Sequence, residues 1–163
     1  MMHPCFQRLT RSRARSGAAC VVAALLSLLP WAGQAAECGI TVNTDDAIRF
    51  TPAHIVVPSS CKDFTVTLTE TGHLPALAMS HNWVLTKKSD LDGVARTGMV
   101  AGAQAQFIDR TDKRVLAYTK LIGAGETTTV TLTVAQLIIG ETYAFLCTFA
   151  GHSPIMRGTL IVE

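Results

Sequence analysis

A cysteine, a histidine and a methionine lie within ten residues near the end of the chain, in the stretch CTFAGHSPIM (147–156). Cys147 precedes His152 by five residues, and Met156 follows four residues later. Thiolate, imidazole and thioether together form the ligand set that selects copper and accommodates Cu(I). A straight strand would hold these side chains many ångströms apart, so a loop must bring them together. The spacing indicates a metal site, with a small buried core cysteine as the ordinary alternative.

A trigonal copper site needs a second imidazole from elsewhere in the chain. His81 is the best placed, because it opens SHNWVL, an apolar strand that can pair in the core. Asn82 beside it can hydrogen-bond backbone near the thiolate. His54 at a strand start and His73 in the turn TGHLP are expected to be exposed or capping residues. Taken alone, His81 would be interpreted as a buried core histidine. The presence of Cys147, His152 and Met156 favours a metal ligand instead.

The first 35 residues have the features of a secretory signal peptide. Four arginines precede an apolar run at 18–29 that is too short to span a bilayer comfortably, and small residues follow it up to Ala35. The length argues against a membrane anchor, and the acidic residue before Cys38 argues against lipid attachment there. We therefore expect cleavage after Ala35 and a periplasmic chain, residues 36–163, without a membrane anchor.

The charge of the predicted exported chain differs from that of the full chain. All 163 residues together carry a net charge of +2, but without the four N-terminal arginines ten basic residues face twelve acidic ones, which gives −2. Nothing in this balance argues for nucleic-acid binding. Residues 36–163 suffice for one domain with one core, and no linker divides them.

Three of the five cysteines, Cys38, Cys61 and Cys147, follow residue 35. In an oxidising compartment a pair should be bridged, which leaves one thiol over. Cys38 and Cys61 both stand at the edges of predicted strands, but the sequence alone does not prove that they pair. Cys147 is left as the better candidate for chemistry.

The elements that must position these residues are mostly strands. Alternating or β-rich runs predict strands at 40–42, 48–50, 54–57, 64–70, 82–86, 127–134, 141–149 and 158–163. The Ala- and Gly-rich segment 88–107 is expected to hold a short helix, and 135–139 one helical turn. Short strands at this spacing predict an all-β antiparallel sandwich with one inserted helix.

The chain resembles the azurins, small periplasmic blue-copper proteins of the cupredoxin family. The resemblance covers essentially all of 36–163, through AEC, SCKDFTVTL, LPALAMSHNWVLT, TKLIGAGE, FLCTFAGHS and MRGTL. Its specific part is the ligand loop, because Cys-x4-His-x3-Met is the azurin spacing among blue-copper proteins. The resemblance implies a cupredoxin-like Greek-key β-sandwich and a non-enzymatic type 1 copper protein that shuttles single electrons.

The resemblance also implies one copper ion per chain. The implied ligands are His81, Cys147 and His152, with Met156 as a weak axial ligand. A backbone carbonyl before the first histidine commonly makes a further weak axial contact, and here Ser80 stands where the family commonly has glycine.

Other implied features surround the ligands. The disulfide of the family joins the first two cysteines of the exported chain, here Cys38 and Cys61. We further predict that Asn82 and the backbone amide of Phe149 hydrogen-bond to or around the sulfur of Cys147.

The chain departs from the family pattern at several positions. Ala150 stands where the ligand loop usually has proline, and Pro154 adds a proline later in the same loop. Glu70 and Tyr118 occupy positions where many azurins carry a histidine, so effects attributed to those histidines do not transfer.

An apolar surface patch is implied where electrons leave through His152. The matching positions are Ile48, Leu74, Ala78, Met79, Met99, Phe149 and Pro154. The implied partners are c-type cytochromes, dehydrogenases or a nitrite reductase, and we expect a monomer.

Two rival functions fit part of the pattern. Cys147 with His152 as its base would make a nucleophile, but no motif supplies an orienting group or an oxyanion site. A periplasmic carrier of copper, or a zinc site, would use the same cysteine and two histidines. The enclosure by a strand and a loop favours electron transfer, because a carrier needs a more exposed site.

Overall fold

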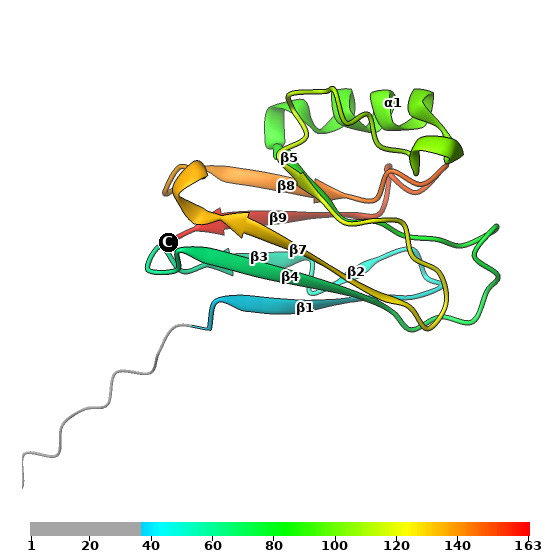
Figure 1. Ribbon diagram of the computed structural model, residues 1–163, viewed down its shortest axis with the longest axis horizontal. Helices are drawn as coiled ribbons and strands as arrows, with labels where there is room; N and C mark the ends of the chain where they lie inside the picture. The colour runs from blue at the N-terminus through cyan, green and yellow to red at the C-terminus, as the bar shows by residue number, and fades with distance from the viewer. Residues whose placement is uncertain (1–36) are drawn as a thin grey trace, which may run out of the picture. The chain divides into compact units, whose positions relative to one another are not determined.

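The structure, a computed structural model, describes residues 37–163 as two β-sheets with one α-helix (Figure 1). The predicted signal peptide lies outside these residues. The first sheet has the order β2-β1-β4-β7, with β1 Gly39–Thr44, β2 Phe50–Thr51, β4 Asp63–Glu70 and β7 Thr127–Thr133. The second has the order β3-β9-β8-β5-β6, with β3 His54–Val57, β9 Arg157–Val162, β8 Thr142–Leu146, β5 Val84–Lys87 and β6 Ala117–Tyr118.

The core lies between the sheets and follows from the alternation of β4. Phe64, Val66 and Leu68 point inward and are buried, while the threonines between them are partly exposed. From the other side, Trp83 and Phe145 fill the centre, with ring centroids 5.2 Å apart and no exposed surface. Two inner faces of alternating apolar residues are the packing that defines a β-sandwich.

Helix α1, Leu91–Ala101, follows β5 through the 3-10 turn η1, Lys88–Asp90, and is followed by η2, Ala103–Ala105. Val94 on the helix packs against Val84, Ile108 and Leu146 in a second, smaller apolar cluster. The helix thus lies beside β5 and β8, as Figure 1 shows, and covers the sheet face opposite the main core. No helix among residues 37–163 is long and apolar enough to cross a membrane.

The predicted fold class, an all-β Greek-key sandwich with one inserted helix, is confirmed, but the expectation of purely antiparallel pairing is wrong for two pairs. Strand β1 runs parallel to β4, with Gly39 opposite Thr65, and β3 runs parallel to β9, with His54 opposite Thr159. After β1 and β2 the chain passes to the other sheet as β3 and then returns as β4. Such a crossover lets β4 lie beside β1 in the same direction.

Element ends differ from the predictions near the site. The strand predicted at 141–149 ends at Leu146, so Cys147 is the first residue beyond β8. The strand predicted at 48–50 keeps only Phe50, because Ile48 has a φ of 55°, outside the extended region. The strand β6 was not predicted, and the helical turn predicted at 135–139 is η3, Val134–Gln136.

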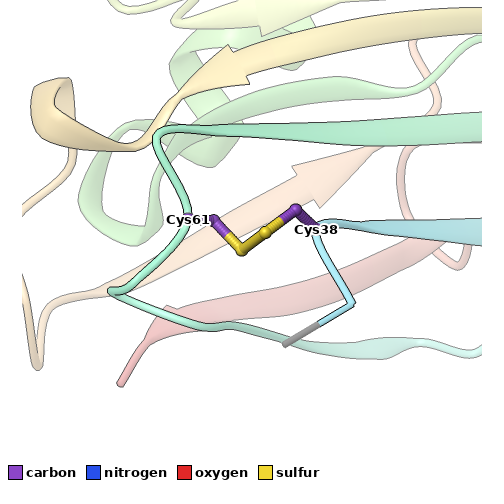
Figure 2. Close-up of a disulfide and its surroundings, with 2 residues drawn as sticks. All are labelled: Cys38 and Cys61. Atoms are coloured by element: carbon purple, nitrogen blue, oxygen red, sulfur yellow. A yellow bond between two sulfur atoms is a disulfide. The ribbon is translucent and has the colours of Figure 1, made fainter. Parts of the chain in front are cut away.

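A disulfide joins Cys38 to Cys61, with a Cα–Cα distance of 5.6 Å (Figure 2). It links the segment before β1 to the segment before β4, and all of β1 pairs with β4. Cys147 is the free cysteine among the described residues, and it is buried.

Candidate metal centre

Two loops at one end of the sandwich carry the predicted ligands. Cys147, His152 and Met156 lie in the loop from β8 to β9, and His81 lies just before β5. The amide of Met156 donates to the carbonyl of His152 at 2.9 Å, and the amide of Cys147 donates to the carbonyl of Met156 at 3.0 Å. Gly151, with a φ of 82°, provides the left-handed turn inside this loop. The loop therefore folds back on itself and brings its three side chains together.

His81 is held by backbone pairing. Its amide donates to the carbonyl of Ile122 at 2.8 Å, and the amide of Ile122 donates back at 2.9 Å. This isolated bridge extends the edge of the second sheet by one pair beyond β5. It fixes the backbone at His81, so the ring enters the site from a rigid support.

The donor atoms of these residues converge. One donor atom from each of His81, Cys147 and His152 lies within 4.8 Å of the other two. The sulfur of Cys147 is 3.9 Å from Nδ1 of His81 and 3.7 Å from Nδ1 of His152. The thioether sulfur of Met156 lies 3.1 Å from Nδ1 of His81. Two imidazoles, one thiol and one thioether facing a common point, all buried, fit a soft metal ion such as copper.

Burial sets the protonation of these donors. It raises the pKa of the Cys147 thiol to about 12, while the backbone N–H groups of Asn82 and Phe149 act in the opposite direction. Burial lowers the pKa of His81 to about 4, with a smaller effect from His152, and burial also lowers the pKa of His152. Both imidazoles are therefore neutral at neutral pH, as metal ligation requires, and metal binding would release the thiol proton.

Asn82 connects the two loops that carry the ligands. Its Oδ1 accepts from the backbone amide of Thr148 at 2.9 Å, and its Nδ2 donates to Oγ1 of Thr148 at 2.9 Å. Nδ2 also lies 3.2 Å from the carbonyl oxygen of Gln106. Asn82, which follows His81, is thus hydrogen-bonded to Thr148, which follows Cys147. These hydrogen bonds fix the spacing between the two ligand segments.

Ser80 is buried next to His81. Its hydroxyl donates to the carbonyl of Ala76 at 2.6 Å, so the side chain turns back into its own loop. Ile48, Gln106 and Phe107 are the described non-glycine residues with positive φ. Ser80 is not among them, so a side chain is accommodated where the family commonly has glycine.

The residues predicted for the apolar patch divide into two groups. Leu74 and Met99 are each 43% exposed, and Ala78 and Pro154 are exposed. Ile48, Met79 and Phe149 are partly buried, and the first and last of these pack against the core.

Two large exposed residues in these segments were missed. Leu77 is 98% exposed and lines a surface groove together with Phe149 and Ala150, while Ile155 in the ligand loop is 67% exposed. Leu77 belongs to the apolar run LPALAM just before the first ligand, and this run was the available signal. The ring of His152 itself lies 4.7 Å from that of Phe149 and is 4% exposed.

His54 and His73 do not belong to this cluster of donors. His54 is exposed and its Nδ1 lies 2.8 Å from Oγ1 of Thr159, and His73 is exposed in its turn.

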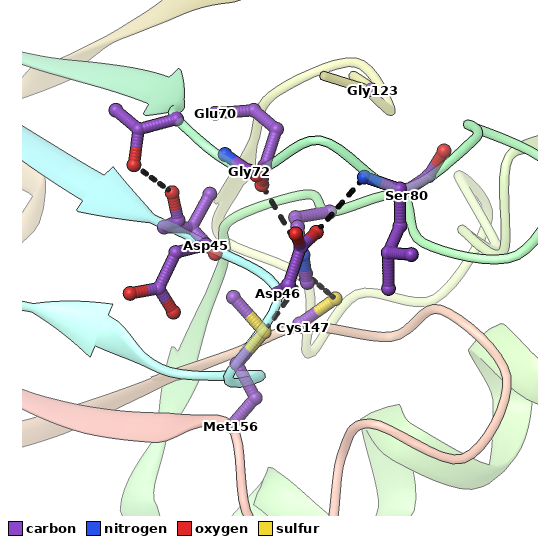
Figure 3. A network of polar contacts seen from close by, with 12 residues as sticks. Asp45, Asp46, Glu70, Gly72, Ser80, Gly123, Cys147 and Met156 are labelled. Carbon is purple, nitrogen blue, oxygen red and sulfur yellow. Dashed lines mark hydrogen bonds and ion pairs between the residues drawn. The ribbon is translucent and has the colours of Figure 1, made fainter. Parts of the chain in front are cut away.

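A buried carboxyl group at the site was not predicted. Glu70 lies at the end of β4 (Figure 3) and is 2% exposed. Its Oε2 lies 3.2 Å from Nε2 of His81. Burial raises the pKa of Glu70, and the amide of Gly72 acts against this shift. The alternation of β4 was the available signal, because Glu70 follows Phe64, Val66 and Leu68 on the inward face.

Comparison with known proteins agrees with this geometry. A family model described as copper binding proteins, plastocyanin/azurin family, matches residues 36–163. An azurin of Pseudomonas aeruginosa is 46% identical over 139 residues, which cover 85% of this chain and 94% of that protein. An azurin of Achromobacter denitrificans is 47% identical over 126 residues, which cover 77% and 85% respectively. The solved structure of an azurin from the methylotroph Methylomonas sp. strain J superposes with a TM-score of 0.75 at 44% identity, over 78% of this chain and 99% of that one.

Proposed function

The chain belongs to the plastocyanin/azurin family of copper-binding proteins. From this premise we propose how its residues bind copper and support electron transfer. The protein is a blue copper electron carrier. His81, Cys147 and His152 would hold one copper ion through Nδ1, Sγ and Nδ1, with the thioether of Met156 as a further, weaker ligand. The observation that carries this assignment is the convergence of these three buried donors within 4.8 Å, with the thioether of Met156 beside them.

The bound copper supplies one-electron chemistry by alternating between Cu(I) and Cu(II). The protein holds the donors in place so that they need to move little between the two oxidation states. Asn82 ties the two ligand loops together, and the amides of Asn82 and Phe149 stabilise the thiolate of Cys147. The backbone carbonyl of Ser80 would be a further weak contact to the ion, supported by the position of Ser80 directly before His81.

Electron transfer accounts for the burial of the site better than its rivals. An enzyme that used Cys147 as a nucleophile would need a reactive thiolate, but burial raises the pKa of this thiol to about 12. A copper or zinc carrier would need ligands that a partner can reach, and His81 and Cys147 have no exposed surface. A buried, rigid site suits a metal that stays bound while electrons pass.

We place electron exchange on the apolar surface around His152. Three exposed apolar residues support this placement: Leu77 lies in the loop before His81, Ile155 in the ligand loop and Met99 on α1. Apolar patches of this kind mark partner surfaces, and electron-transfer complexes are small and transient. The proposed partners are c-type cytochromes, dehydrogenases or a nitrite reductase, met by a monomer in the periplasm after removal of residues 1–35.

A substitution on this surface tests the proposal. In Leu77→Lys, the self-exchange rate between Cu(I) and Cu(II) protein, measured by NMR line broadening, should fall at least tenfold, because two charged patches repel each other on contact. The spectrum of the copper centre should stay unchanged, because Leu77 is 98% exposed and its side chain does not support the site.

The matched control is Ile139→Lys, where a 67% exposed apolar residue near Cys61, at the disulfide end of the sandwich, is replaced in the same way. Unchanged self-exchange in Leu77→Lys, or an equal loss in Ile139→Lys, would remove this surface from the proposal.

A further inference from the structure

Glu70 is the one acidic side chain among the described residues that touches a predicted ligand. It ends β4 on the inward face, and the side chains of Glu70 and His81 are 1% and 0% exposed. Its Oε1 accepts a hydrogen bond from the amide of Gly72 at 2.6 Å. Its Oε2 lies 3.2 Å from Nε2 of His81. A carboxyl group so fully removed from water requires a partner.

Both facing atoms lack any other partner. Oε2 of Glu70 and Nε2 of His81 are buried without a well-aligned hydrogen bond to another group, although they are within ion-pair distance of each other. The distance of 3.2 Å between the two atoms suits a hydrogen bond. Among the described residues, each atom therefore has the other as its partner at ion-pair distance.

The neighbouring acidic groups are already engaged. Asp46 accepts from the amides of His73 and Leu74 at 2.9 and 3.3 Å, and Asp45 pairs with Arg49 at 3.1 Å. Figure 3 shows Asp45 and Asp46 together with Glu70 and Gly72. Asp45 and Asp46 therefore have other partners, whereas the carboxyl group of Glu70 faces the ring of His81.

Gly72 makes room for the carboxyl group. A Cβ at this position would lie 2.6 Å from Oε1 of Glu70 and 2.3 Å from Oδ1 of Asp46, closer than such atoms approach. The absence of a side chain at Gly72 therefore lets the carboxyl group of Glu70 sit against the backbone and face His81.

We propose that Glu70 is a positioning residue for His81: its carboxylate accepts a hydrogen bond from Nε2–H, which fixes the ring with Nδ1 free to face Cys147 and Met156. A histidine that binds a metal through one nitrogen donates its other N–H, and a carboxylate acceptor raises the basicity of the ligand. The negative charge beside the ring also stabilises the more positive oxidation state of a bound copper ion, so it lowers the reduction potential. This inference rests on the proposed function only for its effect on the potential.

The first test needs no metal. The ¹⁵N chemical shifts of the His81 ring in metal-free protein should show a neutral imidazole with the proton on Nε2. In Glu70→Leu, which keeps the site apolar but removes the acceptor, this preference should be lost and both tautomers should appear. A proton on Nδ1 in the unaltered protein would overturn the proposal even if the copper centre forms normally, so its failure is distinct from that of the proposed function.

The second test measures the reduction potential of the copper-loaded protein by voltammetry. In Glu70→Gln, which keeps the acceptor oxygen but removes the charge, the potential should rise while the copper spectrum is retained. In Glu70→Leu, copper affinity should fall about tenfold to a hundredfold, as for other losses of a ligand's hydrogen-bond partner.

The matched control is Glu126→Gln. Glu126 is a nearby carboxylate that accepts from the amide of Gly123 at 2.9 Å and touches none of the predicted ligands. It should leave the potential and the His81 tautomer unchanged. An unchanged potential in Glu70→Gln, or an equal rise in Glu126→Gln, would overturn the assignment. If Glu70→Gln does not fold, the tautomer in the unaltered protein decides alone.

Discussion

The side chain of Asn82 connects the two loops that carry the predicted ligands. It makes hydrogen bonds at 2.9 Å to both the amide and the hydroxyl of Thr148 and one at 3.2 Å to the carbonyl oxygen of Gln106, in a region closed to water. Buried polar groups that lose their partners carry a desolvation penalty. The stability of the two ligand loops therefore depends on this amide.

Replacing Asn82 with Ala should lower the free energy of unfolding of the metal-free protein by about 2–3 kcal/mol, because the amide of Thr148 is left buried without an acceptor. Chemical denaturation checks this value. Thr148→Val removes only the hydroxyl contact, so it should cost about 1 kcal/mol. Equal losses in the two variants would contradict the role given to the backbone contact.

Residues of the site that lie close together in the sequence were easier to predict than residues that come together only in the fold. Cys147, His152 and Met156 share one short loop, so their spacing was enough to group them. His81 is distant in sequence, and it was predicted only because a copper site needs a second imidazole. Glu70 was seen only as a departure from a family pattern, because its contact with His81 depends on how β4 faces the loop before β5, and residue spacing contains no such information.

At the scale of elements, Asp112 anchors α1 to the loop that follows it. Its carboxylate accepts from Nη2 and Nε of Arg114 at 2.7 and 2.9 Å and from the hydroxyl of Thr97 on the helix at 2.8 Å. The hydrogen bonds from Arg114 are the main reason that the pKa of Asp112 lies far below its ordinary value. The folded state thus favours the ionised form.

This pairing makes a pH-dependent contribution to stability. Because the folded pKa is depressed, the stabilisation is present above the ordinary pKa of about 4 and is lost as the pH falls below it. Asp112→Asn should lower the free energy of unfolding by about 1 kcal/mol at pH 7, and the difference should shrink below pH 4. Thermal unfolding over this range is the measurement, and a difference that does not change with pH would contradict the account.

The elements themselves were predicted from alternation, but their pairing was not. Strand β4 was found because Phe64, Val66 and Leu68 alternate with threonines. The parallel pairing of β1 with β4 and of β3 with β9 depends on the path of the chain between the sheets, which no local pattern encodes. The strand β6 was not predicted, because its two residues are too few to show an alternation of apolar and polar side chains.

At the scale of the whole molecule, the disulfide lies at a distance from the metal centre along β4. Cys38 and Cys61 precede β1 and β4, whereas Glu70 and the site lie at the other end of β4. The disulfide closes a loop with a sequence separation of 23 residues. A crosslink of this size stabilises the fold mainly by restricting the unfolded chain.

Replacing Cys38 and Cys61 together with Ala should therefore lower the free energy of unfolding by about 3 kcal/mol. The copper spectrum and the reduction potential should stay as they are, because no ligand segment depends on the crosslink. Denaturation and voltammetry on the same double variant check both parts. A shifted potential would show that the two ends of the sandwich are coupled.

Addition of Cu(II) to the metal-free protein tests the central claim most directly. We expect an intense visible band from charge transfer between the thiolate of Cys147 and copper, which saturates at one ion per chain and bleaches on reduction. The band should be absent in Cys147→Ser, which removes the thiolate but retains both imidazoles. Failure of the band to form in the unaltered protein, or its survival in Cys147→Ser, would contradict the assignment of this site.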